Sequence, residues 1–341
     1  MCEKWGKLLI LGVIIKIMSK IDQYIQAATR DNTRQSYQAA VRHFEVEWGG
    51  FLPATADSIA NYLVEYAETL AINTLRQRLA ALAQWHISQG FPDPTKSPIV
   101  RKVFRGIQAL HPAKEKQAKP LQLDQLEQVV RWLASAIGRA RQDNDRCSEL
   151  RHVRNKALLL LGFWRGFRGD ELTRLQVEHV TVLPGEGMIC YFSQTKSDRR
   201  YQGSSFKTPA LSRLCPVEAF VEWINSAQLT SGPVFRAIDR WGHIAEVGLH
   251  EDSLTPIFRS TLNNAGIESA ELYSGHSLRR GFASWATSNG WDIKTLMEYV
   301  GWKNIQSAMR YVDAADPFSR QRIESSLTIP APKNRIMKIA E

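Results

Sequence analysis

Apolar residues recur at intervals of three and four along the first third of the chain, and this spacing predicts a bundle of helices. The first run ends at Gly49 and Gly50 and carries Tyr37, Val41, Phe44 and Trp48. Runs of the same period begin near Asp57, Asn73 and Ser97. Each begins on a residue that can cap a helix N-terminus, so we expect four helices around one core up to about residue 110.

The periodicity breaks at residues 111–120, where Pro112 and Pro120 flank a polar segment that contains lysines. Such a stretch neither continues a helix nor buries itself, so it is expected to be an interdomain linker. We expect a helical domain at 19–110, a second domain at 121–327 and a basic tail at 328–341. Residues 1–18 are expected to be an over-extended start or a disordered end.

Helical spacing returns after the linker, from Asp124 and again over the strongly apolar residues 157–163. The period then changes to two in three short runs, at residues 179–183, 188–192 and 201–208, which are separated by turn-forming residues. These runs predict a small three-stranded antiparallel sheet inside an otherwise helical domain. Further helical runs follow at 215–224 and 254–263.

Three short helices are expected near the end of the second domain. The first carries an apolar stripe and ends at Gly290, and the second lies between a capping Asp292 and Gly301. Asn304 can cap the third, whose expected inward positions are Ile305, Ala308, Met309 and Val312. The fold class expected from these patterns is mainly α.

The chain of 341 residues has a formal net charge of +10, which favours a polyanionic partner. Residues 8–15 are apolar but too few to span a bilayer, which takes roughly 20, so no membrane partner is expected. The four cysteines, at positions 2, 147, 190 and 215, are scattered without a C-x-x-C pair, which gives no sign of a zinc site or a disulfide framework. A reducing, cytoplasmic compartment is therefore expected.

Cations crowd the last two helices of the first domain and the turn that joins them. They are Arg76, Arg78, Lys96, Arg101, Lys102 and Arg105. A solvated helix face is the ordinary interpretation of any one of them. Together, with few acidic residues nearby, they favour contacts with the phosphates of double-stranded DNA.

Candidate catalytic groups cluster in two stretches of the second domain. His276 and Arg279 are three residues apart, which puts them on one face of a helix. Upstream, Arg168 and Glu171 have the same spacing beside a helix start, where the carboxylate can orient the guanidinium. The second and third β-like runs are joined by a polar turn with several cations, Lys196, Arg199 and Arg200, and Lys207 follows.

The H-x-x-R pattern at His276, then Trp302, then a tyrosine nine positions later at Tyr311, resembles the C-terminal signature of the tyrosine recombinase (phage integrase) family. The G-x-R-x-x-E-L box around Arg168 adds to the resemblance, which extends over residues 21–322. It implies a helical, SAM-like core-binding bundle and a mixed α/β catalytic domain with a three-stranded sheet, together forming a C-shaped clamp on DNA.

The resemblance also implies a role for each matching residue. Tyr311 would attack the scissile phosphate to give a 3′-phosphotyrosine and a free 5′-hydroxyl. The phosphate would be held by Arg168, supported by Glu171, and by Arg279, with hydrogen bonds from His276 and Trp302. His276 could also assist deprotonation of the nucleophile. Lys196 is the best match for the general acid, with Arg199, Arg200 and Lys207 as alternatives.

Two positions depart from the common family pattern. Trp302 stands where most members have a second histidine, and it keeps an N–H donor but cannot shuttle protons. Arg280 stands where another polar residue is common, and it is expected to contact DNA or to serve the structure.

The resemblance implies site-specific recombination by a tetramer through a Holliday junction, with a C-terminal helix passed between protomers, as in phage or transposon integrases. No cofactor, nucleotide or metal ion is expected, and the sequence has no clustered carboxylates of the kind a two-metal nuclease needs. Two alternatives stay open. One is DNA relaxation of the type IB topoisomerase kind, and the other is a catalytically inactive DNA-binding factor.

Overall fold

The computed structural model describes residues 20, 23–25, 28–112, 117–193, 195, 202–309 and 311. The chain divides into two compact units, Met1–Lys116 and Gln117–Glu341. Each unit has its own hydrophobic core. Three predictions concern residues outside the described ranges, namely residues 1–18, the C-terminal tail at 328–341 and Lys196.

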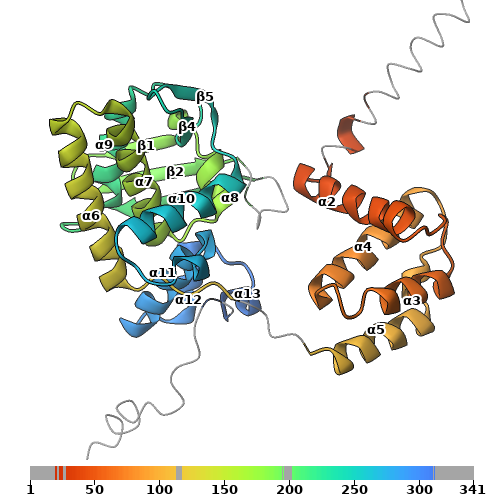
Figure 1. The fold of residues 1–341 in the computed structure, drawn as a ribbon. Helices are drawn as coiled ribbons and strands as arrows, with labels where there is room; N and C mark the ends of the chain where they lie inside the picture. The colour runs from red at the N-terminus through yellow and green to blue at the C-terminus, as the bar shows by residue number, and fades with distance from the viewer. Residues whose placement is uncertain are drawn as a thin grey trace, which may run out of the picture. The chain divides into compact units, whose positions relative to one another are not determined.

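Unit 1 is helical throughout its described part (Figure 1). It contains α2 (Asp31–Arg42) continued by a π-helical turn (His43–Glu47), α3 (Ala56–Glu65), α4 (Ile72–Ser88), a 3₁₀ turn (Pro94–Lys96) and α5 (Pro98–Leu110). The apolar positions that share the helical period meet in its core, which includes Phe44, Ile59, Tyr62, Leu63, Leu75, Leu82, Val100 and Ile107. The helices expected from the sequence are thus present, and their stripes explain why they pack together.

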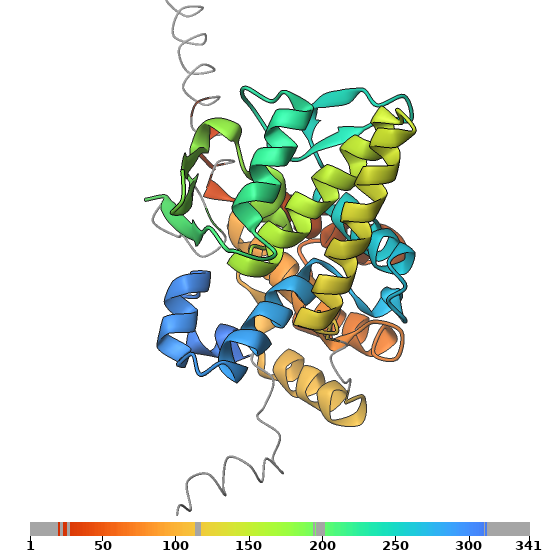
Figure 2. The same cartoon turned by 90° about the vertical axis from the view of Figure 1, so that its left-hand side faces the viewer.

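Unit 2 is built around α7 (Arg146–Arg165), whose residues 157–163 are buried on every side. Helices α6 (Leu123–Gln142) and α9 (Pro216–Ala227) run beside it (Figure 2), and α10 (Glu251–Asn264) packs against it as well. A helix that is apolar all round needs such cover on all faces. Because α7 is covered on all sides, its C-terminal end at Arg165 and Gly166 has a fixed position in unit 2.

The expected three-stranded antiparallel sheet is confirmed, in the order β1 (Val180–Leu183), β2 (Gly187–Phe192) and β3 (Ser204–Pro209). Cys190 pairs with both Val180 and Phe206, which fixes the register of the two ladders. A second sheet, β4 (Arg236–Ile238) with β5 (Ile244–Gly248), was not expected. Its strands are too short and irregular to give a period-two signal.

The remaining helices are α8 (Gly169–Arg174), α11 (Gly275–Ser288), α12 (Ile293–Val300) and α13 (Ile305–Met309). The last three, in blue in Figure 1, lie together in unit 2. Asp292 and Gly301 bound α12 as expected. One expectation for α13 is wrong: Ala308 is buried, but Ile305 and Met309 are 54% and 56% exposed. A helix of five residues places little more than one position against the core.

The mainly α fold class, with its small three-stranded sheet, is therefore confirmed. No helix in the described ranges is both long enough and apolar enough to cross a membrane.

Candidate active site

The turn between α7 and α8 places the first arginine. Gly166 ends α7 at φ +60°, and a β-carbon there would lie 3.3 Å from Val300 and 3.7 Å from Arg279. Arg168 then precedes α8, and Glu171 binds it twice: Oε1 accepts from Nη1 at 2.7 Å, and Oε2 accepts from the backbone N–H at 2.8 Å. Because Glu171 is 5% exposed, this charge-assisted pair fixes the guanidinium of Arg168.

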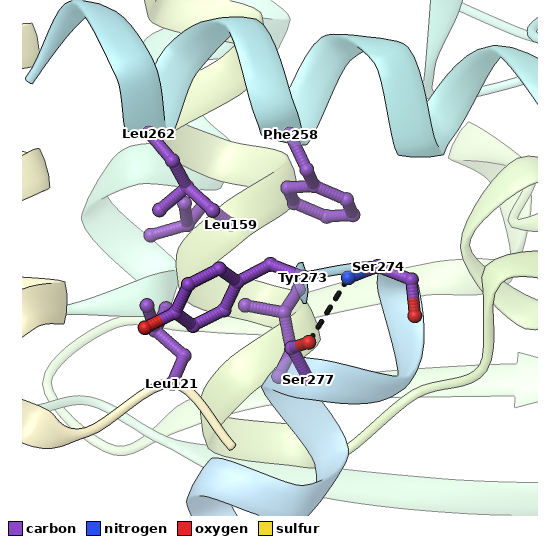
Figure 3. A pocket seen from close by; sticks show the side chains of 8 residues that line it. Leu121, Leu159, Phe258, Leu262, Tyr273, Ser274 and Ser277 are labelled. Atoms are coloured by element: carbon purple, nitrogen blue, oxygen red, sulfur yellow. Dashed lines mark hydrogen bonds between the residues drawn. The ribbon is translucent and has the colours of Figure 1, made fainter. Parts of the chain in front are cut away.

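Serines at the start of α11 place His276 and Arg279. The Ser274 backbone N–H donates to Ser277 Oγ at 3.0 Å (Figure 3). Ser274 Oγ accepts from the His276 N–H at 3.3 Å. This reciprocal capping satisfies donors that a helix N-terminus would leave open. The small hollow beside it is lined mainly by apolar side chains, among them Leu159 and Phe258, and belongs to the core.

Arg279, one turn beyond His276, is completely buried. Its Nη1 donates to the Gly166 carbonyl at 2.5 Å and lies 3.8 Å from Glu171 Oε2, while Nε and Nη2 have no partner in the described part of the chain. Burial, together with the nearby charge of Arg168, lowers the pKa of Arg279 to about 9. The side chain is thus a buried cation in which two of the three nitrogens find no acceptor among the described residues.

Trp302 follows the left-handed Gly301 that ends α12. It is 4% exposed, and its indole Nε1 finds no acceptor among the described residues. The Arg279 guanidinium carbon lies 4.9 Å from the centre of the Trp302 ring. A third unpartnered donor therefore lies next to the two on Arg279.

Tyr311 completes the cluster. Its ring stacks on Trp302 with centroids 5.2 Å apart and an interplanar angle of 25°, and it lies 5.5 Å from the Arg279 guanidinium carbon. Its hydroxyl is 3.2 Å from His276 Nδ1. The phenol is therefore within hydrogen-bond reach of a possible base and beside a buried cation.

The cluster has two guanidinium groups and a single carboxylate, Glu171. Buried donors without partners are rare in folded proteins and call for an explanation. A tetrahedral oxyanion would supply several acceptor oxygens and the missing negative charge at once. In the described ranges, no three His, Cys, Asp or Glu side chains come together in a way that could hold a metal ion.

The structure thus brings together Arg168, His276, Arg279, Trp302 and Tyr311, which the sequence separates by up to 143 residues (311 − 168). Lys196 lies outside the described residues, as do Arg199 and Arg200. Lys207 is exposed on β3, opposite Ile189.

Arg280 is 8% exposed and donates from Nη1 to Gln117 Oε1, which favours the structural of its two expected roles.

In unit 1, the expected DNA-binding residues fall into two groups. Arg101, Lys102 and Arg105 are exposed on α5. The others have protein partners: Lys96 lies 3.5 Å from Asp93, Arg76 donates to Asn73, and Arg78 donates to the Ala39 carbonyl at 3.1 Å. The exposed α5 group is therefore the better candidate for phosphate contacts.

Sequence reasoning missed two contributors to the site. The Gly166 carbonyl accepts from Arg279 across 113 positions, and Arg165 packs behind α12. A clue to Arg165 is its place at the end of an otherwise apolar helical run, where a cation is unexpected.

Comparison with known proteins gives one family. A model of the phage integrase family matches residues 116–317. An integrase/recombinase XerD homologue of Selenomonas ruminantium is 29% identical over 313 residues, which cover 89% of this chain and 87% of that protein. The Cre recombinase of Escherichia phage P1 is 27% identical over 282 residues, 78% of each chain.

Solved structures share the fold. The Tn1549 transposon integrase in complex with circular intermediate DNA matches with a TM-score of 0.57 and 17% identity, covering 92% of this chain and 99% of that one. A lambda integrase dimer bound to a core site matches with a TM-score of 0.51 and 15% identity, covering 89% and 96%. At such identities the likeness shows the arrangement of the chain alone.

Proposed function

The chain belongs to the phage integrase family, and we propose that it is a site-specific tyrosine recombinase that breaks and rejoins strands of double-stranded DNA. The observation that carries the proposal is a set of buried donors on Arg279 and Trp302, beside the Tyr311 hydroxyl, that find no partner in the part of the chain the structure describes. A phosphodiester in that position would satisfy them. The named relatives, a XerD homologue and Cre, are recombinases, which supports the same activity.

The first half of the reaction follows from the contacts. Tyr311 Oη attacks the scissile phosphorus while His276 Nδ1, 3.2 Å away, accepts or orients its proton. Arg279 and Trp302 donate to the non-bridging oxygens, and Arg168, held by Glu171, neutralises the charge that develops on them. The P–O bond to the 5′-oxygen breaks as the bond to Tyr311 forms.

The departing 5′-oxygen needs a proton, and we assign this role to Lys196, between β2 and β3. The products are a 3′-phosphotyrosine and a free 5′-hydroxyl. Because the new ester keeps the energy of the broken linkage, attack by a 5′-hydroxyl from another strand reverses the step without a nucleotide or a metal ion. Two such exchanges convert one pair of duplexes into another through a Holliday junction.

This strand exchange requires several active sites on two duplexes, so we propose a tetrameric synapse, in which a C-terminal helix passes to a neighbouring protomer. The α5 cations of unit 1 would contact DNA phosphates. The reaction would take place on DNA in the cytoplasm of a bacterium or phage host.

Covalent trapping tests the proposal. Genomic fragments are incubated with the protein, denatured, and the protein-linked DNA is sequenced to find the site, which is then made as a nicked substrate that cannot religate. Wild type should form an adduct, and Tyr311→Phe, which loses only the hydroxyl, should form none. Tyr37→Phe, a matched change in α2 of unit 1, should behave as wild type.

Two further measurements separate the alternatives. A type IB topoisomerase would relax supercoils without joining strands of two different duplexes, whereas a recombinase exchanges them. A catalytically inactive factor would bind the site without any adduct. Binding with no adduct from wild type would sink the proposed activity.

A further inference from the structure

Arg165, in the last turn of α7, is the most unusual charged residue near the site that the mechanism does not use. It is 4% exposed, and it forms no ion pair with any residue in the ranges the structure describes. Burial lowers the pKa of its guanidinium. A cation this deeply buried persists only if other groups compensate for its lost hydration.

Aromatic rings and one carbonyl supply most of that compensation, although Nε finds no hydrogen-bond partner among the described residues. The guanidinium carbon lies 4.2 Å from the centre of the Tyr299 ring, on α12, and 4.8 Å from that of Phe206, on β3. The Phe167 ring is 5.9 Å away. Nη1 donates to the Tyr299 backbone carbonyl. A planar guanidinium can contact several ring faces and donate a hydrogen bond at the same time, which the compact ammonium group of lysine does less well.

The carbonyl that Arg165 binds lies in the last turn of α12, where helix carbonyls lack internal partners and the helix dipole is negative. Immediately beyond it, the N–H groups of Gly301 and Trp302 both donate to the Met297 carbonyl, at 2.9 Å and 2.8 Å. A β-carbon on Gly301 would lie 2.8 Å from the Phe206 ring, so β3 packs closely against this turn. Arg165 thus fixes the backbone from which the Trp302 indole extends.

We propose that Arg165 is a positioning residue that holds the last turn of α12, so that the Trp302 N–H points at the scissile phosphate. It touches neither DNA nor the reacting atoms. This proposal rests on the proposed function, because Trp302 must act as a donor in the strand-cleavage step.

A double-mutant cycle on the nicked substrate tests the coupling. Trp302→Phe keeps a ring but removes the N–H, and we expect the single-turnover cleavage rate at saturating DNA to fall about a hundredfold, the loss typical of one oxyanion donor. Arg165→Gln should lower the same rate by roughly tenfold or more, with DNA affinity unchanged. Adding Arg165→Gln to Trp302→Phe should cause little further loss, because the donor it positions is already gone.

Arg154 supplies the matched control. It is also on α7, 5% exposed, and donates to a carbonyl, that of Arg236, at 3.0 Å, but it faces β4 instead of the site. Arg154→Gln should lower the melting temperature. The folded fraction, measured by the amplitude of adduct formation, should still cleave at the wild-type rate. Arg165→Lys, which keeps a cation at the same place, should recover part of the rate lost in Arg165→Gln.

Each result decides the proposal. Additive losses in the cycle, or a rate unchanged by Arg165→Gln, would overturn it and leave the recombinase activity intact. If both Arg165 variants fail to fold while Arg154→Gln folds, Arg165 is a core residue and the proposal is wrong. If wild type itself forms no adduct, the proposed function fails first and the positioning role fails with it.

Discussion

Arg279 is a buried guanidinium: Nη1 donates to the Gly166 carbonyl and lies 3.8 Å from Glu171 Oε2, whereas Nε and Nη2 find no partner among the described residues. Removing a charge from water without full compensation costs several kcal/mol. The fold therefore contains an energetically unfavourable group whose donors an oxyanion would satisfy. The same residue is expected to limit stability and to provide activity.

Substituting Arg279→Met should separate these two effects. The side chain is similar in length and apolar, so we expect the unfolding free energy without DNA to stay equal or to rise by up to about 4 kcal/mol, while cleavage falls at least about a hundredfold. Urea unfolding measures the first and adduct formation the second. A variant that loses stability and activity together would show that Arg279 is already well paired without DNA.

The difference in unfolding free energy between Arg279→Met and wild type should depend on pH with a definite sign. The pKa of Arg279 is about 9 in the folded protein, below the 12.5 of the free side chain. Below pH 9 the group is charged in both states, so the penalty of burial is fully present. Above pH 9 the folded state releases its proton first, and the penalty declines.

We therefore expect the stability advantage of Arg279→Met over wild type to be constant up to about pH 9 and to narrow above it. Comparing the two proteins cancels the titration of groups they share. Sulfate or inorganic phosphate should narrow the same difference at neutral pH by pairing with the guanidinium. A stability difference that widens with pH, or that neither sulfate nor phosphate changes, would contradict this description of Arg279.

At the scale of elements, residues 119–121, at the end of the expected linker, fix α11 and the turn before it on the side away from the site. The Leu121 N–H donates to the Ser277 carbonyl and the Lys119 N–H to the Leu272 carbonyl, each at 3.0 Å. Gly281 lets this segment approach, since a β-carbon there would lie 2.0 Å from the Leu121 carbonyl oxygen. The helix that carries His276 and Arg279 is thus held between the segment and the site.

The β-carbon added by Gly281→Ala should force α11 away from the backbone at Leu121. We expect a loss of roughly 1–3 kcal/mol in unfolding free energy, the usual cost of overpacking, together with slower cleavage because α11 shifts. Gly138→Ala in α6 is the matched control, since nothing lies within 4 Å of its β-carbon position, and it should stabilise by up to about 1 kcal/mol. Equal effects of the two substitutions would show that the close approach has no energetic weight.

Local patterns made the elements of unit 2 predictable. The helix bounds at Asp292 and Gly301, the pairing of Arg168 with Glu171 and the three strands all depend on residues a few positions apart. A sequence expresses such short-range chemistry directly, through capping, helical spacing and alternation.

Long-range partners could not be predicted in the same way. Arg280 meets Gln117 across 163 positions, and Arg279 meets the Gly166 carbonyl across 113. Backbone carbonyls are present at every residue, so nothing in the sequence marks the one that will accept. The family resemblance led us to expect that the site residues converge. The long-range hydrogen bonds, the packing of the segment behind α11 and the contacts of Arg165 could be found only in the folded structure.

At the scale of the whole molecule, the net charge of +10 and the exposed α5 cations should make DNA binding strongly salt-dependent. Replacing Arg101 and Arg105 by alanine should weaken binding at low salt. The slope of log affinity against log salt should fall by about 1 for each phosphate that the variant no longer neutralises. Cleavage of DNA already bound should proceed at the wild-type rate.

The paired controls Arg101→Lys and Arg105→Lys keep both charges and should keep the slope. Fluorescence anisotropy over a salt series measures it. An unchanged slope in the alanine variant would remove α5 from the DNA-binding surface, whereas a reduced cleavage rate at saturating DNA would mean that unit 1 acts on the chemistry as well.

The reaction proposed for this site bonds one phosphorus to the Tyr311 oxygen while the buried donors of Arg279 and Trp302 hold its oxygens. Peptide mapping of the trapped adduct tests this most directly: after digestion with protease and nuclease, mass spectrometry locates the residue that retains a nucleotide. We predict a nucleotide 3′-phosphate on the peptide that contains Tyr311 and on no other. Attachment to a different residue, or through a 5′-phosphate, would contradict the proposed chemistry.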